Sequence, residues 1–105
     1  MIVPKEELAY YLGKEFSELD RIAQEGKIKT ASLEKLMAHD DITQTEYGLS
    51  IIDYLFLWHQ FQGRSIRSLA KEVGIGYNIL FRIFDELNLP TLTRSESRRR
   101  ELYQR

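Results

Sequence analysis

Apolar residues recur along this chain at spacings of three and four positions, which is the period of an α-helix. No stretch of useful length alternates apolar and polar residues in the way that a half-buried β-strand does. The pattern predicts helices over about residues 5–24, 33–38, 44–61, 66–73 and 77–87. Ser95 could begin a sixth helix, or the tail could be frayed, and the sequence favours neither. We therefore expect an all-α fold.

Residues that favour helix ends lie between these segments. Gly26 and Gly63 are expected to end the first and third helices, and Ser32 could cap the second. Thr43 and Glu46 fit a capping box at the start of the third helix, because a hydroxyl is followed three positions later by a carboxylate. Apolar residues cover most of the surface of this third helix, so we expect it to be the central and most buried element.

Charge is distributed unevenly along the 105 residues. Residues 1–63 hold 6 Lys or Arg and 11 Asp or Glu, whereas residues 64–105 hold 9 and 5. A net charge of −1 therefore combines −5 in the first part with +4 in the second. We expect a polyanion to meet the second part, although chance could also distribute surface charge in this way.

The sequence contains no cysteine, which excludes disulfide bonds and cysteine-based zinc sites and is compatible with a reducing cytoplasm. The first residues lack the basic and apolar regions of a secretion signal. The most apolar run, residues 51–61, is too short to span a bilayer. We therefore expect no membrane association and a cytoplasmic or nucleoid-associated location.

No group of polar residues predicts catalysis or metal binding. His39, Asp40, Asp41 and Glu46 match no familiar spacing of metal ligands, and these residue types are common in solvated turns. His59 lies in an apolar segment, where a histidine is more often a hydrogen-bonded core residue than a catalyst. We therefore expect a protein that is not an enzyme, with no catalytic residue, metal, cofactor or small-molecule ligand.

Residues 65–83 have the pattern of two short helices joined by a tight turn. Ala70 is small enough to let the second helix approach the first, and Gly74 can adopt the positive φ that the turn needs. Leu80 and Ile83 lie one turn apart and would pack the second helix inward.

Over about residues 45–94 the chain resembles the trihelical form of the helix-turn-helix family of DNA-binding domains. The resemblance is carried by Leu69, Ala70, Gly74, Ile75, Leu80 and Ile83. The exit over residues 87–95 is similar to exits in transposases, resolvase-type recombinases, phage regulators and DNA-binding units associated with homing endonucleases. The resemblance implies a trihelical DNA-binding unit over residues 43–94. The helical pattern and the charge distribution add an acidic helical extension over 1–42 and a basic C-terminal tail over 95–105.

The resemblance also implies roles for individual residues, since the second helix of such a unit lies in the major groove of duplex DNA. The residues expected to contact base edges are Tyr77, Asn78, Phe81 and Arg82. Of these, Arg82 could bind guanine and Asn78 could bind adenine. The residues expected to contact phosphates are Arg64, Ser65, Arg67, Ser68, Lys71, Arg94, Arg98, Arg99 and Arg100.

The chain departs from the family at Phe81, where an Arg, Lys or Gln is more usual. Tyr77 and Phe81 would form an exposed aromatic pair, which is typical of a protein interface. Alternatively, Phe81 packs against Trp58 and the helical phase differs by one residue. The hypothesis of DNA binding, by a small transcriptional regulator or a component of a mobile-element or viral system, therefore has two rivals. These are a protein-interaction adaptor on the same fold and a non-catalytic accessory subunit of a nuclease or recombinase.

Two further inferences concern repetition and assembly. Apolar residues at positions 19, 22, 23, 28, 33 and 36 align with those at 66, 69, 70, 75, 80 and 83, a spacing of 47 residues. Residues 19–37 could be a second, degenerate helix-turn-helix, or the likeness could be that of any two amphipathic helices joined by a glycine-containing turn. Because a single helix-turn-helix buries little DNA surface, we also expect a homodimer.

Overall fold

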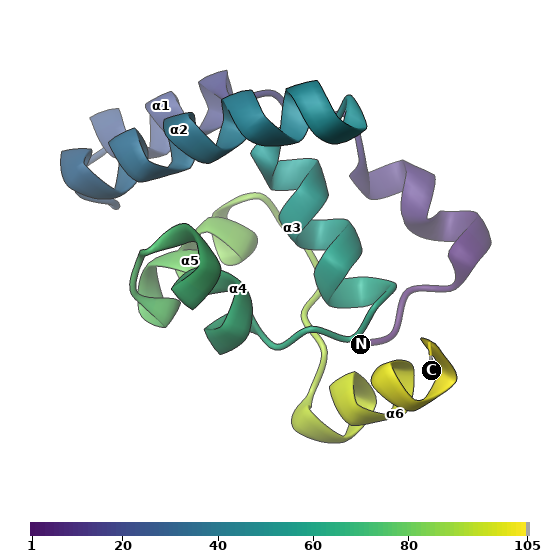
Figure 1. Ribbon diagram of the computed structural model, residues 1–105. Coiled ribbons are helices and arrows are strands. Elements are labelled where there is room, and N and C mark those ends of the chain that lie inside the picture. The colour runs from purple at the N-terminus through teal and green to yellow at the C-terminus, as the bar shows by residue number, and fades with distance from the viewer. Residues whose placement is uncertain (105) are drawn as a thin grey trace.

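The computed structural model describes residues 1–104, with side chains described for residues 1–99. These residues form seven helices and no strand, so the prediction of an all-α fold is confirmed. The elements are η1 (Lys5–Tyr11, a 3-10 helix), α1 (Ser17–Gln24), α2 (Thr30–Tyr47), α3 (Ile51–Gln60), α4 (Ile66–Val73), α5 (Tyr77–Glu86) and α6 (Arg94–Gln104). Figure 1 shows α3 in the middle, α1 and α2 across its upper end, α4 and α5 on one side and α6 below.

Helix α3 is the central element of the core. It contacts α2, α4 and α6, and its side chains Ile51 and Phe56 are completely buried. Ser50 caps the helix, because its hydroxyl accepts the backbone N–H of Asp53 at 3.2 Å. The expectation of a central, buried helix is confirmed, although this helix begins at Ile51 and not near residue 44.

The single helix predicted over residues 5–24 is wrong, because the chain breaks between η1 and α1. Gly13 lies in this break with a φ of +86°, a value that helical residues do not adopt. The carboxylate of the buried Asp53 accepts the backbone N–H groups of Gly13 and Lys14 at 2.9 and 3.1 Å. Asp53 therefore supplies the hydrogen bonds that a continuous helix would otherwise have made.

The predicted helices over 33–38 and 44–61 are also wrong, since α2 runs without interruption from Thr30 to Tyr47. It ends at Gly48, which adopts the left-handed conformation with a φ of +67°. Thr43 is buried inside the helix, where its hydroxyl donates to the carbonyl oxygen of Asp40 at 3.2 Å, so the predicted capping box is absent. Ser32 likewise lies within α2 and does not cap it. The division at residues 42 and 43 falls inside this helix.

Helices α4 and α5 lie where the sequence predicts them. The hydroxyl of Ser65 caps α4 by accepting the N–H of Ser68 at 3.1 Å. Gly74 ends α4 with a φ of +87°, as expected for the turn. Leu80 and Ile83 are buried, so α5 turns its predicted apolar face to the core.

The two segments of the sequence repeat pack in a reciprocal way. Thr30 at the start of α2 aligns with Tyr77 at the start of α5, and α1 contacts α5 while α2 contacts α4. Ile28 and Ile75 are buried in the two corresponding connections. Lys35 of α2 donates to the carbonyl oxygen of Gly74 at 2.9 Å. The two helix pairs therefore contact each other in a reciprocal arrangement.

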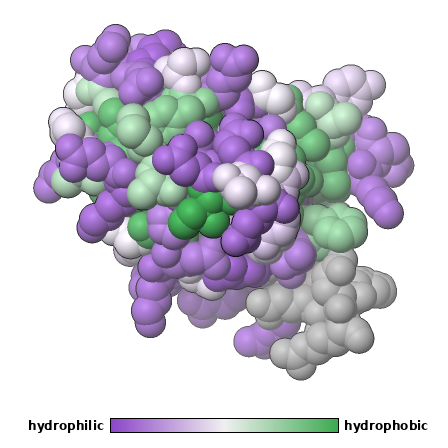
Figure 2. Space-filling model, turned by 45° about the horizontal axis from the view of Figure 1, so that its top comes forward, coloured by the Kyte–Doolittle hydropathy of each residue, from purple (hydrophilic) through white to green (hydrophobic). Residues whose placement is uncertain are grey.

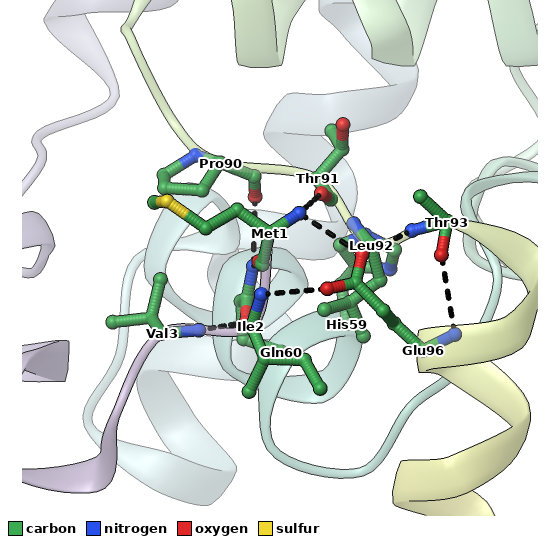
Figure 3. A network of polar contacts seen from close by, with 10 residues as sticks. All are labelled: Met1, Ile2, Val3, His59, Gln60, Pro90, Thr91, Leu92, Thr93 and Glu96. Atoms are coloured by element: carbon green, nitrogen blue, oxygen red, sulfur yellow. Dashed lines mark hydrogen bonds and ion pairs between the residues drawn. The ribbon is translucent and has the colours of Figure 1, made fainter.

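Gln60 at the end of α3 ties distant parts of the chain together (Figure 3). Its side chain is completely buried, and Oε1 accepts the backbone N–H of Val3 at 3.0 Å. Its Nε2 donates to the carbonyl oxygens of Met1 and Pro90 at 2.9 and 3.1 Å. The start of the chain and the segment before α6 are therefore held on the same turn of α3.

The sequence left open whether the tail forms a sixth helix or is frayed, and the structure shows helix α6 there. Thr93 and Glu96 make a capping box: Thr93 Oγ1 accepts the N–H of Glu96 at 3.2 Å, and the Glu96 carboxylate accepts the N–H of Thr93 at 2.9 Å. The N–H of Thr93, together with the ammonium group of Met1, lowers the pKa of Glu96 to about 2. The helix therefore begins after Thr93, and Ser95 is not its cap.

Within the described part of the chain, no helix is both long enough and apolar enough to cross a membrane.

Candidate nucleic-acid interface

Helix α5 has one buried and one exposed face. Leu80, Ile83 and Phe84 point into the core and are almost completely buried. The four residues predicted to read bases, Tyr77, Asn78, Phe81 and Arg82, are all exposed. Tyr77 and Phe81 are four residues apart, as are Asn78 and Arg82, so the four side chains form two adjacent rows on the exposed side of the helix.

The predicted aromatic pair is present. The rings of Tyr77 and Phe81 lie edge to face with 6.1 Å between their centroids, and they are 38% and 43% exposed. The guanidinium group of Arg67, from α4, lies over the ring of Tyr77 at 4.4 Å. The alternative in which Phe81 packs against Trp58 is wrong, because Phe81 is exposed and contacts Tyr77, whereas Trp58 stacks on Tyr54 with 4.3 Å between the ring centroids.

A hollow of about 260 Å³, which we call the aromatic groove, lies between α4, α5 and the chain that enters α6. Ser65, Arg67, Tyr77, Phe81 and Arg94 are among the residues that line it. It therefore brings two predicted base-reading residues together with three predicted phosphate-contacting residues. Its apolar walls and charged side chains suit a ligand that combines a flat apolar group with an anion.

Arg64 differs from the other predicted phosphate contacts whose side chains are described, because its guanidinium group is paired with a carboxylate. Nη1 lies 2.6 Å from the carboxylate of Glu72, and Nη2 donates to the hydroxyl of Ser68 at 2.9 Å. The hydroxyl of Tyr54 also donates to Glu72 at 2.9 Å. Arg64 therefore links the start of α4 to its end and, through Glu72, to α3.

The electrostatics of this network are set by burial and by its hydrogen bonds. Burial, together with the hydrogen bond to Glu72, raises the pKa of Tyr54 to about 12. Burial also acts to raise the pKa of Glu72, but the hydrogen bonds from Arg64 and Tyr54 outweigh it and lower that pKa. Glu72 is therefore charged at neutral pH and keeps Arg64 paired.

The remaining predicted phosphate contacts lie at different points of the surface. Ser65 and Ser68 are joined by the helix cap already described. Lys71 of α4 and Arg98 and Arg99 of α6 are exposed. The side chain of Arg100 lies outside the described residues.

A second hollow, of about 620 Å³, lies on the other side of α5. Asn78 and Arg82 line it together with Lys27 and Lys29 from the connection between α1 and α2 and with Thr30 at the start of α2, and we call it the basic hollow. Lys27, Lys29 and Thr30 were not predicted from the sequence, because they belong to the part of the chain whose net charge is negative. Two lysines on either side of the buried Ile28 are the local signal that could have indicated them.

Comparison with protein-family models, curated proteins and solved structures gives no match for this chain. Its function must therefore be inferred from the side chains and their geometry.

His59 is a hydrogen-bonded core residue, as predicted. It is buried on α3, with Nδ1 lying 2.6 Å from the carbonyl oxygen of Arg64 and Nε2 accepting the N–H of Leu92 at 2.8 Å. These partners require the neutral tautomer with hydrogen on Nδ1. Burial lowers the pKa of His59, which agrees with a neutral ring.

Among the described residues, no group of three or more His, Asp or Glu side chains could hold a metal ion. Figure 2 shows the face that carries α1 and α2, where separate hydrophobic areas lie between hydrophilic side chains. Met37, Ile42 and Tyr47 of α2 are each 49% exposed. The exposed side of α5 carries two aromatic rings, the amide of Asn78, the guanidinium group of Arg82 and, at its end, the carboxylates of Asp85 and Glu86.

Proposed function

We propose that this protein binds duplex DNA, with α3, α4 and α5 as a trihelical helix-turn-helix unit and α5 as the helix that enters the major groove. The observation that carries this proposal is the division of α5 into two faces. Leu80 and Ile83 anchor it to the core, while Tyr77, Asn78, Phe81 and Arg82 face solvent beside Arg67. The short connection at Gly74 supports the same proposal, since a tight turn joins the two helices of such a unit.

The exposed side chains of α5 suit base recognition. Arg82 has the paired donors that match O6 and N7 of guanine, and Asn78 has the donor and acceptor that match N6 and N7 of adenine. Tyr77 and Phe81 offer apolar surface to the methyl group of thymine. Arg67, Lys71, Arg94, Arg98 and Arg99 are exposed cations that would contact phosphates on either side of the groove, and Arg100 is proposed with them.

We further propose that the protein works as a homodimer, as a small transcriptional regulator or as the DNA-binding component of a mobile-element or viral system. Two copies on one duplex would place two α5 helices in successive major grooves, roughly 34–36 Å apart. Light scattering during gel filtration tests this assembly directly, because a monomer and a dimer of this chain differ twofold in mass.

Fluorescence anisotropy of a labelled random duplex tests DNA binding. Selection from random DNA would then identify the preferred site, on which Arg82→Ala is compared with the native protein. Loss of one bidentate guanine contact should weaken binding by about 1–3 kcal/mol and relax the preference at one base pair. An unchanged preference at every position would contradict the assignment of Arg82.

The exposure of Tyr77 and Phe81 favours a second candidate, a protein-interaction adaptor on the same fold. An adaptor would bind no DNA, and Phe81→Ala would abolish its binding to a partner protein. An accessory subunit of a nuclease or recombinase would instead bind DNA and also co-purify with that enzyme. DNA affinity and co-purification together therefore separate the three candidates.

A further inference from the structure

We propose that the basic hollow binds a backbone phosphate of the DNA, so that the connection between α1 and α2 forms a second arm of the interface. This inference rests on the proposed function, since it concerns the same duplex. It assigns a binding role to Lys29 and to the start of α2, in the part of the chain whose net charge is negative.

The hollow lies where a phosphate of the DNA backbone would be close to the start of α2. Asn78 and Arg82 line it from α5, and Lys29 and Thr30 line it from the start of α2. Asn78 and Arg82 are also the residues proposed to read bases. A strand whose bases lie against these two residues carries its phosphates at the edge of the same groove, beside the connection between α1 and α2.

The charges around the hollow direct an anion toward Lys29. Lys27 is paired with the carboxylates of Glu86 and Glu25 at 2.9 and 3.1 Å. Among the described residues, by contrast, Lys29 and Arg82 have no carboxylate partner. Glu86 lines the neighbouring hollow with Asp85 and Arg82, and its carboxylate is held by Lys27. The positive charge without a carboxylate partner therefore lies at Lys29 and Arg82.

The start of α2 adds to this attraction. Lys29 is the N-cap of this 18-residue helix, and no side chain caps the helix there. The N–H of Ser32 donates to the carbonyl oxygen of Lys29 at 3.1 Å, whereas those of Thr30 and Ala31 lack partners within the helix. The helix dipole places partial positive charge at the same end. A phosphate beside Lys29 would accept hydrogen bonds from these groups as well as meeting the lysine.

The packing of the two helix pairs brings Lys29 and Arg82 to the same hollow. Lys35 of α2 aligns with Arg82 of α5, and each lies against the connection in the other half of the repeat. Lys35 donates to Gly74 in the connection between α4 and α5, and Arg82 lies at the connection between α1 and α2. The reciprocal packing of the two helix pairs therefore brings the start of α2 to the exposed face of α5.

The test compares Lys29→Ser with a matched control, Lys5→Ser, in the full-length chain. Serine is a preferred N-cap, so Lys29→Ser removes the charge while keeping or improving the start of α2. Lys5 lies on η1, on the other side of α3 from α5 (Figure 1), and its loss changes the net charge by the same amount. Lys29→Arg keeps the charge and serves as the conservative variant.

The measurement is the affinity for one labelled duplex between about 50 and 200 mM salt. Each phosphate contact contributes about 0.9 to the slope of log affinity against log salt. Between the two salt concentrations, the affinity of Lys29→Ser should therefore fall by a factor about 3.5 times smaller than the affinity of the native protein does. Lys5→Ser and Lys29→Arg should keep the native slope. Thermal unfolding of all four proteins checks that the fold is retained.

The outcomes separate this inference from the proposed function. A native protein that binds the duplex, with an unchanged slope for Lys29→Ser, would overturn the phosphate site and leave DNA binding in place. Equal losses for Lys29→Ser and Lys5→Ser would also overturn it, because net charge alone would then explain both. A native protein that does not bind DNA at any salt concentration would overturn both proposals.

Discussion

Arg67 lies over the ring of Tyr77, with 4.4 Å between the guanidinium carbon and the ring centroid. The contact joins the exposed start of α4 to the exposed start of α5. Since the planar guanidinium group lies over the ring, Arg67 holds its charge close to the face of α5 that we propose for base reading. Tyr77 in turn lies edge to face with Phe81, so the three side chains form one ordered surface.

Arg67 should therefore contribute both charge and position to DNA binding. Arg67→Ala should weaken binding and reduce the slope of log affinity against log salt by about 0.9, because one phosphate contact is lost. Arg67→Lys should keep the slope but still weaken binding, because an ammonium group does not stack on Tyr77 as a guanidinium does. Anisotropy titrations at several salt concentrations measure both effects. Native affinity in Arg67→Lys would show that the stack has no role.

The turn between α4 and α5 should tolerate substitution at one glycine and not at the other. Gly74 has a φ of +87°, so Gly74→Ala should lower the free energy of unfolding by about 1–2 kcal/mol through backbone strain. Gly76 has a φ of −69°, which alanine adopts readily. Gly76→Ala should change stability by less than about 0.5 kcal/mol, because a weaker N-cap is offset by a less flexible unfolded chain. Urea unfolding measures both, and equal effects would contradict the proposed strain.

Asp53 should be important for folding of the first part of the chain. Asp53→Ala removes a buried carboxylate that accepts the N–H groups of Gly13 and Lys14, so it should lower the free energy of unfolding by about 2 kcal/mol. The exposed Asp41 provides the control, and Asp41→Ala should have an effect within about 0.5 kcal/mol. Urea unfolding of the two variants would contradict this role of Asp53 if they lost equal stability.

Sequence reasoning succeeded where the structural signals are local. The start of α4 at Ser65, its end at Gly74 and the inward face of α5 depend on residues within one or two helical turns, and all three were predicted. It failed where a distant residue decides. The break at Gly13 depends on a carboxylate 40 positions later in the sequence, which no local pattern reveals.

The candidate site was predicted only where its residues depend on local sequence signals. The exposed face of α5 follows from its own helical period, so its four residues could be named from the sequence. The basic hollow exists only because the connection between α1 and α2 packs against α5, and sequence proximity gives no sign of that contact. Nor could the sequence show that Arg64 is paired with Glu72, eight residues later.

The buried His59 should make stability depend on pH. Its pKa in the folded protein lies below its ordinary value of 6.5, so the unfolded chain binds a proton that the folded protein does not. Its contribution to stability should be fully present above about pH 6.5 and should fall below it by up to about 1.4 kcal/mol per pH unit, until the folded-state pKa is reached. His59→Asn should lose this dependence. Urea unfolding between about pH 5 and 8 tests it, and equal slopes for the two proteins would contradict the role of His59.

The salt dependence of DNA binding by the native protein tests the central proposal most directly. Anisotropy of a labelled duplex, titrated at several salt concentrations, gives the number of phosphates neutralised. The exposed Arg67, Lys71, Arg94, Arg98 and Arg99 lead us to expect a slope of about −4 or steeper in log affinity against log salt. Absence of binding at low salt, or binding that does not change with salt, would contradict the proposal that this protein binds duplex DNA.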